Sequence, residues 1–400
     1  MAANVDTRRK ILPSVAGLLG LGGLGGVIGT GLLGPFRLQF ADHYGLTQTE
    51  IGAAIGVTGA LLGMLGVWQG PRLARRMGRY NLLKAAVGLL TIGLLGCALI
   101  DNLYGLLASW GLVTFGGYLS VIANAVATDI WIDEPRRGVL LLHGSVSTGK
   151  ILGPILAAYA PLAVALLLAK GRYPWQDCFL FAAVGALVIF VLLAGVKQSR
   201  LPRAPDEAAS VEAPRNVPMR AIWLSAALLG LIAGSENAMA SVAPAFYHGV
   251  RGVSDSAAYH LVSLHFVVLA AGRFAFGIFS KKLTPRWIMA VGFLPAFLAI
   301  PAALSPHGIV FVPAYVLMGL CFSITWPAIF VHLAGLLPRN RARLTLTVGL
   351  ANALAIPVCI LATSRMLDGH PRLALLFGPA LLVTCAAVFL VSLRKGQVRG

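Results

Sequence analysis

Long apolar runs, separated by short polar segments, recur along the whole 400-residue chain. Residues 11–34, 51–70 and 82–100 form the first three runs, and each is about as long as the ~20 residues that a helix needs to cross a membrane. Hydrophobic residues make up 58% of the chain and charged residues only 12%, too few to cover a water-soluble domain. The pattern predicts an all-α integral membrane protein.

Twelve such runs predict twelve transmembrane helices. The first run follows three basic residues, as in a signal peptide, but it is too long and lacks a convincing cleavage site. We therefore expect it to remain as the first helix. The predicted spans are 11–34, 50–70, 82–100, 103–130, 138–168, 176–196, 220–246, 256–279, 286–303, 308–335, 343–366 and 372–393.

The longest polar stretch, residues 197–219, divides the spans six and six. It is rich in proline, alanine and charged residues, which is typical of a solvated linker between two bundles. The predicted domains are a six-helix bundle over 1–196, the linker, and a second six-helix bundle over 220–400.

The two halves also resemble each other in sequence. Aligned at one fixed spacing, Ser120 meets Ser323, and at a neighbouring spacing Gly66 meets Gly272. Unrelated helices would rarely keep such a register. The halves are therefore predicted to be two pseudo-symmetric repeats.

The formal net charge is +18, and the basic residues crowd into alternate connections between spans. The positive-inside rule then predicts that both termini and the 197–219 linker lie in the cytoplasm, and we expect a bacterial inner (plasma) membrane. This placement accounts for the charge without a nucleic-acid partner. The crowded connections contain Arg72, Arg75, Arg76, Arg79, Arg136, Arg137, Lys281, Lys282, Arg286, Arg339, Arg341, Arg343, Arg394, Lys395 and Arg399.

The segment after the second span, residues 71–80, reads PRLARRMGRY. It resembles the G-x-L-A-D-R-x-G-R-R loop of the major facilitator superfamily of transporters. The resemblance implies a gating loop that contains Arg75, Arg76, Gly78 and Arg79. Arg75 stands at the acidic position of that motif, so the loop-to-helix salt bridge of the family is not expected in its usual form.

A second motif of that family, G-x-x-x-G-P, is present in the fifth span as Gly149, Gly153 and Pro154, without its trailing glycines. The full motif resembles antiporters, whereas the segments GSENAMASVAPAFY and GRFAFG resemble the fucose-permease-like branch of proton symporters. Over the whole chain the resemblance implies two six-helix bundles that rock around a central cavity. That cavity would be lined by spans one, four, seven and ten, with two, five, eight and eleven. We expect a monomer.

Two glycine-rich segments resemble nucleotide-binding motifs. GSVSTGK ends at Lys150, but Ile151 follows where a P-loop needs Ser or Thr, and a helix precedes it where a strand is required. Gly20, Gly22 and Gly25 spell GxGxxG inside an apolar span, where glycines let helices approach closely. We expect no nucleotide and no other cofactor.

Lys150 and Glu236 are predicted to lie deep in the membrane. Counted at 1.5 Å per residue, Lys150 lies about eleven residues into the fifth span and Glu236 about sixteen residues into the seventh. Charges at this depth usually face a partner or a wet cavity, so both are candidate functional residues. A carboxyl group in low dielectric favours its protonated form, which would let Glu236 load and release a proton. The alternative is a structural ion pair with Lys150 or Arg273.

Three further charged residues have two interpretations each. Arg37 near the outer end of the first span and Arg273 in the eighth would add positive charge along a pathway for an anion. Alternatively, both side chains extend to a headgroup layer. Asp129, near the cytoplasmic end of the fourth span, is either a second site of proton coupling or an anchor for Arg136 or Arg137.

Polar and aromatic side chains at helical spacing complete the candidate substrate site, although several of them can instead join helices. The candidates are Tyr118, Asn124, Asn237, His265, Trp326, His332 and Asn352, together with Lys150, Arg273 and Arg37. No catalytic triad and no paired carboxylates stand out, so we predict no enzyme. The five cysteines are scattered singly and the histidines lack ligand spacing, so we predict no metal site.

Together these observations predict a secondary active transporter that moves a small organic solute by alternating access. We expect the solute to be anionic and its movement to be coupled to protons. Glu236 would carry the proton, and Lys150 and Arg273 would contact the anion. Two alternatives stay open, an exporter of drug-like or amphiphilic compounds and a sensor of transporter-like fold that moves no solute.

Overall fold

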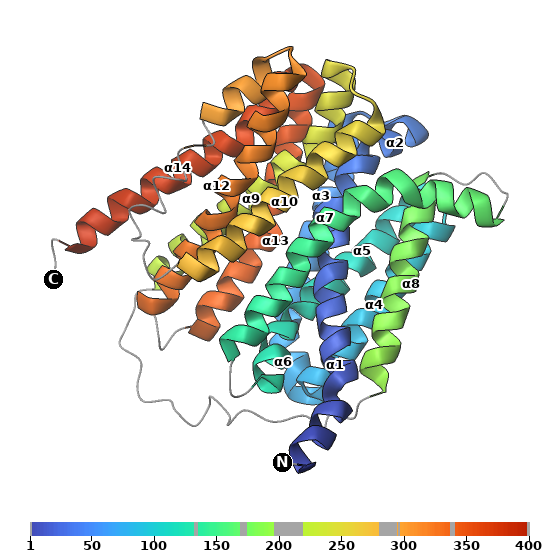
Figure 1. Cartoon of the computed structure of the whole chain (residues 1–400), viewed down its shortest axis with the longest axis vertical. Helices are drawn as coiled ribbons and strands as arrows, with labels where there is room; N and C mark the ends of the chain where they lie inside the picture. Colours follow the sequence, from blue (N-terminus) through green and yellow to red (C-terminus); the bar gives the residue numbers. More distant parts are fainter. Residues whose placement is uncertain are drawn as a thin grey trace. The chain divides into compact units, whose positions relative to one another are not determined.

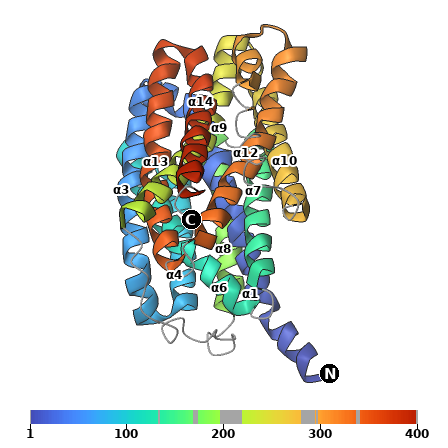
Figure 2. The ribbon, with the colours of Figure 1, turned by 90° about the vertical axis from the view of Figure 1, so that its left-hand side faces the viewer.

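The computed structural model describes residues 2–131, 135–168, 174–195, 219–279, 294, 297–336 and 341–397. These residues form helices and short connections, and no strand occurs among them (Figures 1 and 2). In chain order the elements are α1 (Ala2–Gly26), the π-helical η1 (Val27–Leu32), α2 (Leu33–Tyr44), α3 (Gln48–Met77), α4 (Arg79–Leu99), α5 (Leu103–Leu119), the 3-10 turn η2 (Ser120–Ile122), α6 (Ala123–Ile130), α7 (Pro135–Leu168), α8 (Pro174–Ala194), α9 (Met219–Arg251), α10 (Asp255–Phe279), α12 (Gly308–Leu336), α13 (Arg341–Gly369) and α14 (Pro371–Gln397).

Nine helices among the described residues are long and apolar enough to cross a membrane. They correspond to predicted spans one to four, six to eight, eleven and twelve, while α7 and α12 coincide with spans five and ten. Most of the ninth predicted span, 286–303, lies outside the described residues. Along α8 an exposed apolar stripe includes Val184 and Val191, which are 53% and 60% exposed. Such a continuous apolar face suits contact with lipid.

The first helix extends well past its predicted end at residue 34. It passes through the π-helical turn η1 and continues as α2 to Tyr44. The extension places Arg37 inside a helix. Polar residues in the segment FRLQFADHY hid this extension, because the prediction followed the apolar run alone.

The predicted gating loop is almost entirely helical, which corrects the sequence interpretation. α3 continues to Met77, and Arg79 begins α4, so only Gly78 lies between them. Gly78 has a φ of 83°, a conformation that residues with a side chain rarely adopt. Arg75 and Arg76 therefore lie on the last turn of α3.

The chain divides into two compact units. Unit 1 contains residues 1–32 and 58–214, and unit 2 contains residues 33–57 and 215–400. Residues 33–57, which form α2 and the start of α3, thus group with the second half of the chain. The predicted start of the linker at residue 197 lies outside the described residues, whereas its predicted end at 219 coincides with the start of α9. The boundaries of the two predicted bundles remain a prediction.

Glycines bring α1 and α7 into close contact within unit 1. A Cβ atom on Gly149 would lie 1.8 Å from the carbonyl oxygen of Gly23, and one on Gly22 would lie 2.2 Å from Ser145 Oγ. Both helices therefore need glycine at these positions. The prediction that the GxGxxG glycines serve helix packing is confirmed for Gly22 and wrong for Gly25, which meets nothing within 4 Å.

One pair of glycines that the predicted internal repeat aligns lies at a close helix contact in each unit. On α3, a Cβ atom on Gly66 would lie 2.8 Å from the carbonyl oxygen of Phe115 in α5. On α10, a Cβ atom on Gly272 would lie 2.2 Å from Ser323 Oγ in α12. In unit 1, α3 packs on α5 through Gly66. In unit 2, α10 packs on α12 through Gly272, at the aligned position.

Candidate functional site

An ion pair joins α9 to α10 inside unit 2. Arg273 Nη2 donates a hydrogen bond to Glu236 Oε2 at 3.3 Å. The Glu236 side chain is 5% exposed and that of Arg273 is 23% exposed. The structure thus places Arg273, one of the two partners proposed from the sequence, beside Glu236.

The helix that carries Glu236 is packed closely against α13. A Cβ atom on Gly230 would lie 2.9 Å from the carbonyl oxygen of Ala351, and one on Gly234 would lie 3.0 Å from that of Ala355. Helices in such close contact keep their register. Glu236 is therefore presented by a rigid element at a fixed position.

His265 lies fully buried on α10 and faces α12, which runs beside it within unit 2. Its Nδ1 lies 3.0 Å from the carbonyl oxygen of Tyr315, and because a carbonyl only accepts, Nδ1 carries the hydrogen. The imidazole stacks on the Tyr315 ring at a centroid distance of 4.9 Å, and Tyr315 contacts Tyr247 of α9 at 5.2 Å. His265 thus joins an aromatic cluster that the sequence analysis did not identify.

Arg37 is enclosed where α2 meets the start of α3. The residue is 4% exposed, and Nη2 donates to the carbonyl oxygen of Gln48 at 3.1 Å. A Cβ atom on Gly52 would lie 2.6 Å from the same Nη2, so glycine leaves the room that the guanidinium needs. Arg37 is therefore buried inside unit 2. A side chain that extends to the headgroup layer, the alternative given in the sequence analysis, would lie on the surface of the unit.

The first turn of α3 is capped twice. Thr47 and Glu50 form a capping box, with Thr47 N donating to Glu50 Oε2 at 2.8 Å and Glu50 N donating to Thr47 Oγ1 at 3.1 Å. Asp368, at the end of α13, accepts hydrogen bonds from the backbone of Gln48 at 3.2 Å and of Thr49 at 2.7 Å. The sequence analysis missed Asp368, because the eleventh span was predicted to end at 366.

Three predicted site residues lie in unit 1. Tyr118 packs against α3, where a Cβ atom on Gly63 would lie 2.6 Å from its ring. Asn124 donates to the carbonyl oxygen of Val121 at 3.4 Å, and its buried Oδ1 has no hydrogen-bond partner among the described residues. Lys150 is half-buried on α7. A buried amide oxygen without a partner is open to a ligand.

The remaining predicted residues lie in unit 2. Asn237 donates to a carbonyl oxygen of its own helix at 2.7 Å. Trp326 stacks on Phe330 at a centroid distance of 5.3 Å, and within the part of the chain that the structure describes its buried Nε1 has no hydrogen-bond partner. Within the same residues the buried Oδ1 of Asn352 has none either. The side chain of His332 lies outside the described part.

A second ion pair connects α4 to α6 in unit 1. Arg79 Nη1 donates to Asp129 Oδ1 at 3.1 Å and to Oδ2 at 3.2 Å. The sequence analysis named Arg136 or Arg137 as the partner of Asp129, and their side chains lie outside the described part. A salt bridge therefore forms next to the α3–α4 connection, with Arg79 at the start of α4 as its cation, although Arg75 replaces the acid of the motif.

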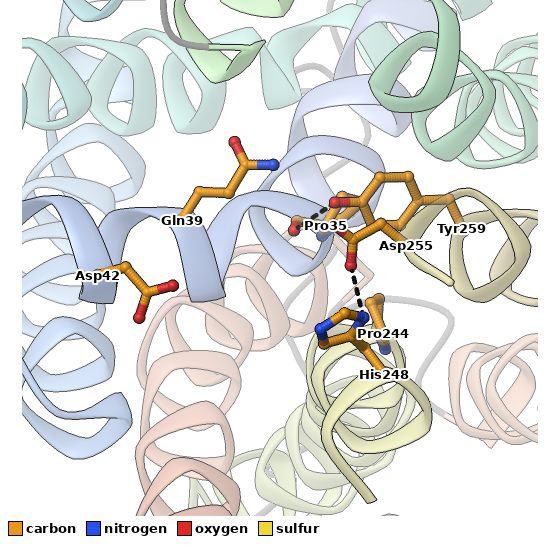
Figure 3. Close-up of a pocket in the computed structure, with 7 residues that line it drawn as sticks. All are labelled: Pro35, Gln39, Asp42, Pro244, His248, Asp255 and Tyr259. Atoms are coloured by element: carbon orange, nitrogen blue, oxygen red, sulfur yellow. Dashed lines mark hydrogen bonds and ion pairs between the residues drawn. The ribbon is translucent and has the colours of Figure 1, made fainter. Parts of the chain in front are cut away.

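A cavity of about 140 Å³ lies in unit 2 between α2, α9 and α10. Figure 3 shows His248 paired with Asp255 at 3.0 Å and Tyr259 donating to the carbonyl oxygen of Pro35 at 3.1 Å. None of its lining residues was predicted, because they lie at helix ends outside the deep polar stripes. No cluster suited to a metal occurs among the residues that were described.

Comparisons with known proteins identify the fold. Residues 19–358 match the family model of the Major Facilitator Superfamily. No curated protein is similar enough in sequence to match.

Three solved structures show how far the likeness extends. A D-xylose–proton symporter has a TM-score of 0.75 and 17% identity, covering 94% of this chain and 97% of that one. A bacterial homologue of the human lysosomal transporter Spinster, inward-facing and occupied, has a TM-score of 0.74 and 18% identity over 95% and 96%. The nucleoside transporter NupG has a TM-score of 0.66 and 13% identity over 94% and 99%. The likeness confirms the predicted all-α membrane fold, in which twelve helices form two bundles.

Proposed function

Because the chain belongs to the major facilitator superfamily of membrane transporters, we propose that it is a secondary active transporter of a small organic anion, coupled to protons. The observation that carries the proposal is the Arg273–Glu236 pair. A cation that binds anions and an acid that binds protons lie in contact at 3.3 Å, and the acid is almost enclosed.

Movement of the anion and movement of the proton would be coupled if the anion replaced Glu236 as the partner of Arg273. The planar guanidinium binds carboxylate and phosphate groups through paired hydrogen bonds, so a solute anion can take the place of Glu236. Glu236 would then lose its cation while it stays enclosed, and a carboxylate in that situation takes up a proton. Each anion would therefore bring one proton with it.

Further predicted residues would complete the solute site. The amide oxygens of Asn124 and Asn352, which accept no hydrogen bond from the described residues, suit hydroxyl groups of the solute, and Lys150 would add a second positive charge. We propose that Tyr118, Asn237, His265, Trp326, His332 and Arg37 line the remainder. Asp129, which has Arg79 as a partner, would be a second and weaker candidate for proton coupling.

The direction of insertion is part of the proposal. Basic residues crowd the alternate connections, which supports cytoplasmic termini and a bacterial inner membrane. We propose that the protein acts as a monomer.

The two alternatives have less support. The half motif that resembles antiporters includes Gly149, and the contact of this residue with Gly23 gives it a packing role that is independent of direction. The altered segment after α3 was the argument for a sensor, and the Arg79–Asp129 salt bridge still ties the start of α4 to α6. The first observation weakens the argument for an exporter, and the second weakens the argument for a sensor.

A ligand screen tests the anion. Purified protein would be heated with lactate, gluconate, glycerol 3-phosphate, neutral xylose or tetraphenylphosphonium, and unfolding would be followed by tryptophan fluorescence. We expect one class of anion to raise the melting temperature, because a ligand stabilises the state that binds it. Stabilisation by tetraphenylphosphonium alone would contradict an anionic solute and favour the exporter.

Glu236→Gln tests the proton. In proteoliposomes we expect this variant to lose accumulation of the anion driven by a proton gradient while it keeps exchange of anion for anion. Asp101→Asn, which removes an exposed carboxylate between α4 and α5, serves as the matched control and should accumulate the anion normally. Undiminished accumulation by Glu236→Gln would remove Glu236 from the coupling step.

A further inference from the structure

One face of α3 remains uncovered by the protein along the second half of the helix. Leu61, Leu65 and Trp68 are 59%, 39% and 51% exposed on this face. Arg72 and Arg75 continue it, because the five residues follow i, i+4, i+7, i+11 and i+14 and thus share one side of the helix. The opposite side holds the glycines that pack against α5.

The order of side chains along this face follows the layers of a membrane. Leu61 and Leu65 suit the hydrocarbon core, and Trp68 suits the interface, where tryptophan is enriched. Arg72 lies about 6 Å beyond Trp68 and Arg76 about 12 Å beyond it, at 1.5 Å per residue. The arginines therefore reach the depth at which lipid phosphate groups lie.

The arginines of this turn are arranged for an anion. Arg72 lies over the Trp68 ring with its guanidinium carbon 4.2 Å from the ring centroid, and this contact fixes its direction. Arg75 and Arg76 are exposed on the same turn. In the described part of the chain, no ion pair joins these three arginines to an acid, whereas the next arginine, Arg79, is paired with Asp129.

The position of Arg75 makes the patch uniformly cationic. The family motif has an acid at this place, and an acid would neutralise one neighbour. With arginine there, three guanidinium groups lie within five residues at the carboxy-terminal end of a helix, where the helix dipole also favours cations. Guanidinium groups bind phosphate oxygens in pairs.

We propose that Trp68, Arg72, Arg75 and Arg76 form a binding site for the headgroup of an anionic phospholipid. The phosphodiester would contact the three arginines, and the acyl chains would lie along Leu61 and Leu65. The site is independent of the solute and of proton coupling, so it stands or falls separately from the proposed function.

Native mass spectrometry of the full-length protein in neutral detergent tests the site. Dioleoylphosphatidylglycerol and dioleoylphosphatidylcholine would be titrated separately, and glycerol 3-phosphate would be added as a competitor that has the phosphate without the acyl chains. We expect a tight phosphatidylglycerol site with little phosphatidylcholine binding. Glycerol 3-phosphate at the same concentration should displace little lipid, because it lacks the apolar contacts.

The variant Arg72→Gln/Arg75→Gln removes two of the guanidinium groups. We expect phosphatidylglycerol affinity to fall roughly 25-fold, since each arginine near an anionic surface is worth about fivefold. Arg365→Gln/Arg372→Gln removes two exposed arginines of α13 and α14 and should change this affinity less than about twofold. Trp68→Leu is a milder second variant. It should lower the affinity for both lipids, and the ratio of the phosphatidylglycerol affinity to the phosphatidylcholine affinity should stay nearer to that of the wild type.

Three results would overturn the proposal. The first is equal binding of the two lipids by the wild type, and the second is an equal loss of affinity in both double variants. The third is competition by glycerol 3-phosphate that is as strong as competition by the lipid. The last result would indicate a site for soluble phosphate compounds instead. Unchanged tryptophan-fluorescence melting of each variant would show that a loss of lipid does not follow from unfolding.

Discussion

Two arginine–carboxylate pairs in the described residues differ more in their surroundings than in their geometry. Arg79 contacts both oxygens of Asp129, at 3.1 and 3.2 Å, and its side chain is 43% exposed. Arg273 contacts one oxygen of Glu236 at 3.3 Å, and the Glu236 side chain is only 5% exposed. The pair with the shorter contacts is the one that water reaches.

The comparison shows that burial, and not distance, decides what each pair can do. At the exposed pair, water can replace either partner, so the pair adds little stability and serves to connect α4 with α6. At the enclosed pair, the 5% exposed Glu236 carboxylate cannot be hydrated when the guanidinium of Arg273 leaves it. Protonation of Glu236 would relieve this cost, in line with the proposed coupling to protons.

Among the variants of these two pairs, Arg273→Ala should lower the stability of the protein most. It removes the guanidinium that contacts the enclosed Glu236, and we expect the free energy of unfolding to fall by about 3 kcal/mol. Titration with sodium dodecyl sulfate in mixed micelles, followed by circular dichroism, would measure the loss. Binding of the anion found in the ligand screen should be lost as well.

The double variant Glu236→Ala/Arg273→Ala distinguishes two causes of the stability loss, an enclosed charge and lost side-chain packing. With both charges removed, no unbalanced charge remains, and we expect the double variant to regain most of the stability that Arg273→Ala loses. A double variant less stable than Arg273→Ala would show that the side chains act through packing and that the enclosed charge is not the source of the loss.

Asp129→Asn should have a smaller effect. Because Arg79 is well exposed, its guanidinium can be hydrated when the acid is removed, and we expect a loss of about 0.2–1 kcal/mol in the free energy of unfolding. The same titration measures it. A loss as large as that of Arg273→Ala would mean that the two pairs are energetically alike and that exposure is a poor guide.

Salt should give the smallest and most selective effect. Raising the ionic strength from 0.01 M to 1 M shortens the screening length from about 30 Å to about 3 Å, and only a hydrated pair responds strongly. The stability difference between the wild type and Asp129→Asn should shrink by a few tenths of a kcal/mol, estimated from the worth of exposed pairs. The difference between the wild type and Arg273→Ala should stay constant.

Most of the fold could be predicted from the sequence, because long membrane-spanning helices are evident from their apolar composition alone. Helix ends were harder to predict, since the prediction followed apolar runs. The first helix continues past residue 34 through polar residues to Tyr44, and α3 continues through a basic segment to Met77. In both cases tertiary contacts and helix propensity extend a helix beyond the apolar part.

The candidate site was predictable only where a charge stood out against an apolar background. Glu236 and Arg273 were identified in this way, and their pairing was one of two alternatives. Asp368 and Tyr315 were missed for different reasons, since Asp368 lies past the predicted end of its span and Tyr315 resembles any core aromatic residue. Contacts between distant parts of the chain cannot be read from local spacing.

The double cap of α3 has a consequence for the order in which the protein is made. Thr47 and Glu50 can cap the helix as soon as the ribosome has released them. Asp368 is synthesised 320 residues after Gln48, which at ~5–20 residues per second is a delay on the order of tens of seconds. During translation the start of α3 thus depends on its local cap alone, and the bonds to Asp368 form only once almost the whole polypeptide has been made.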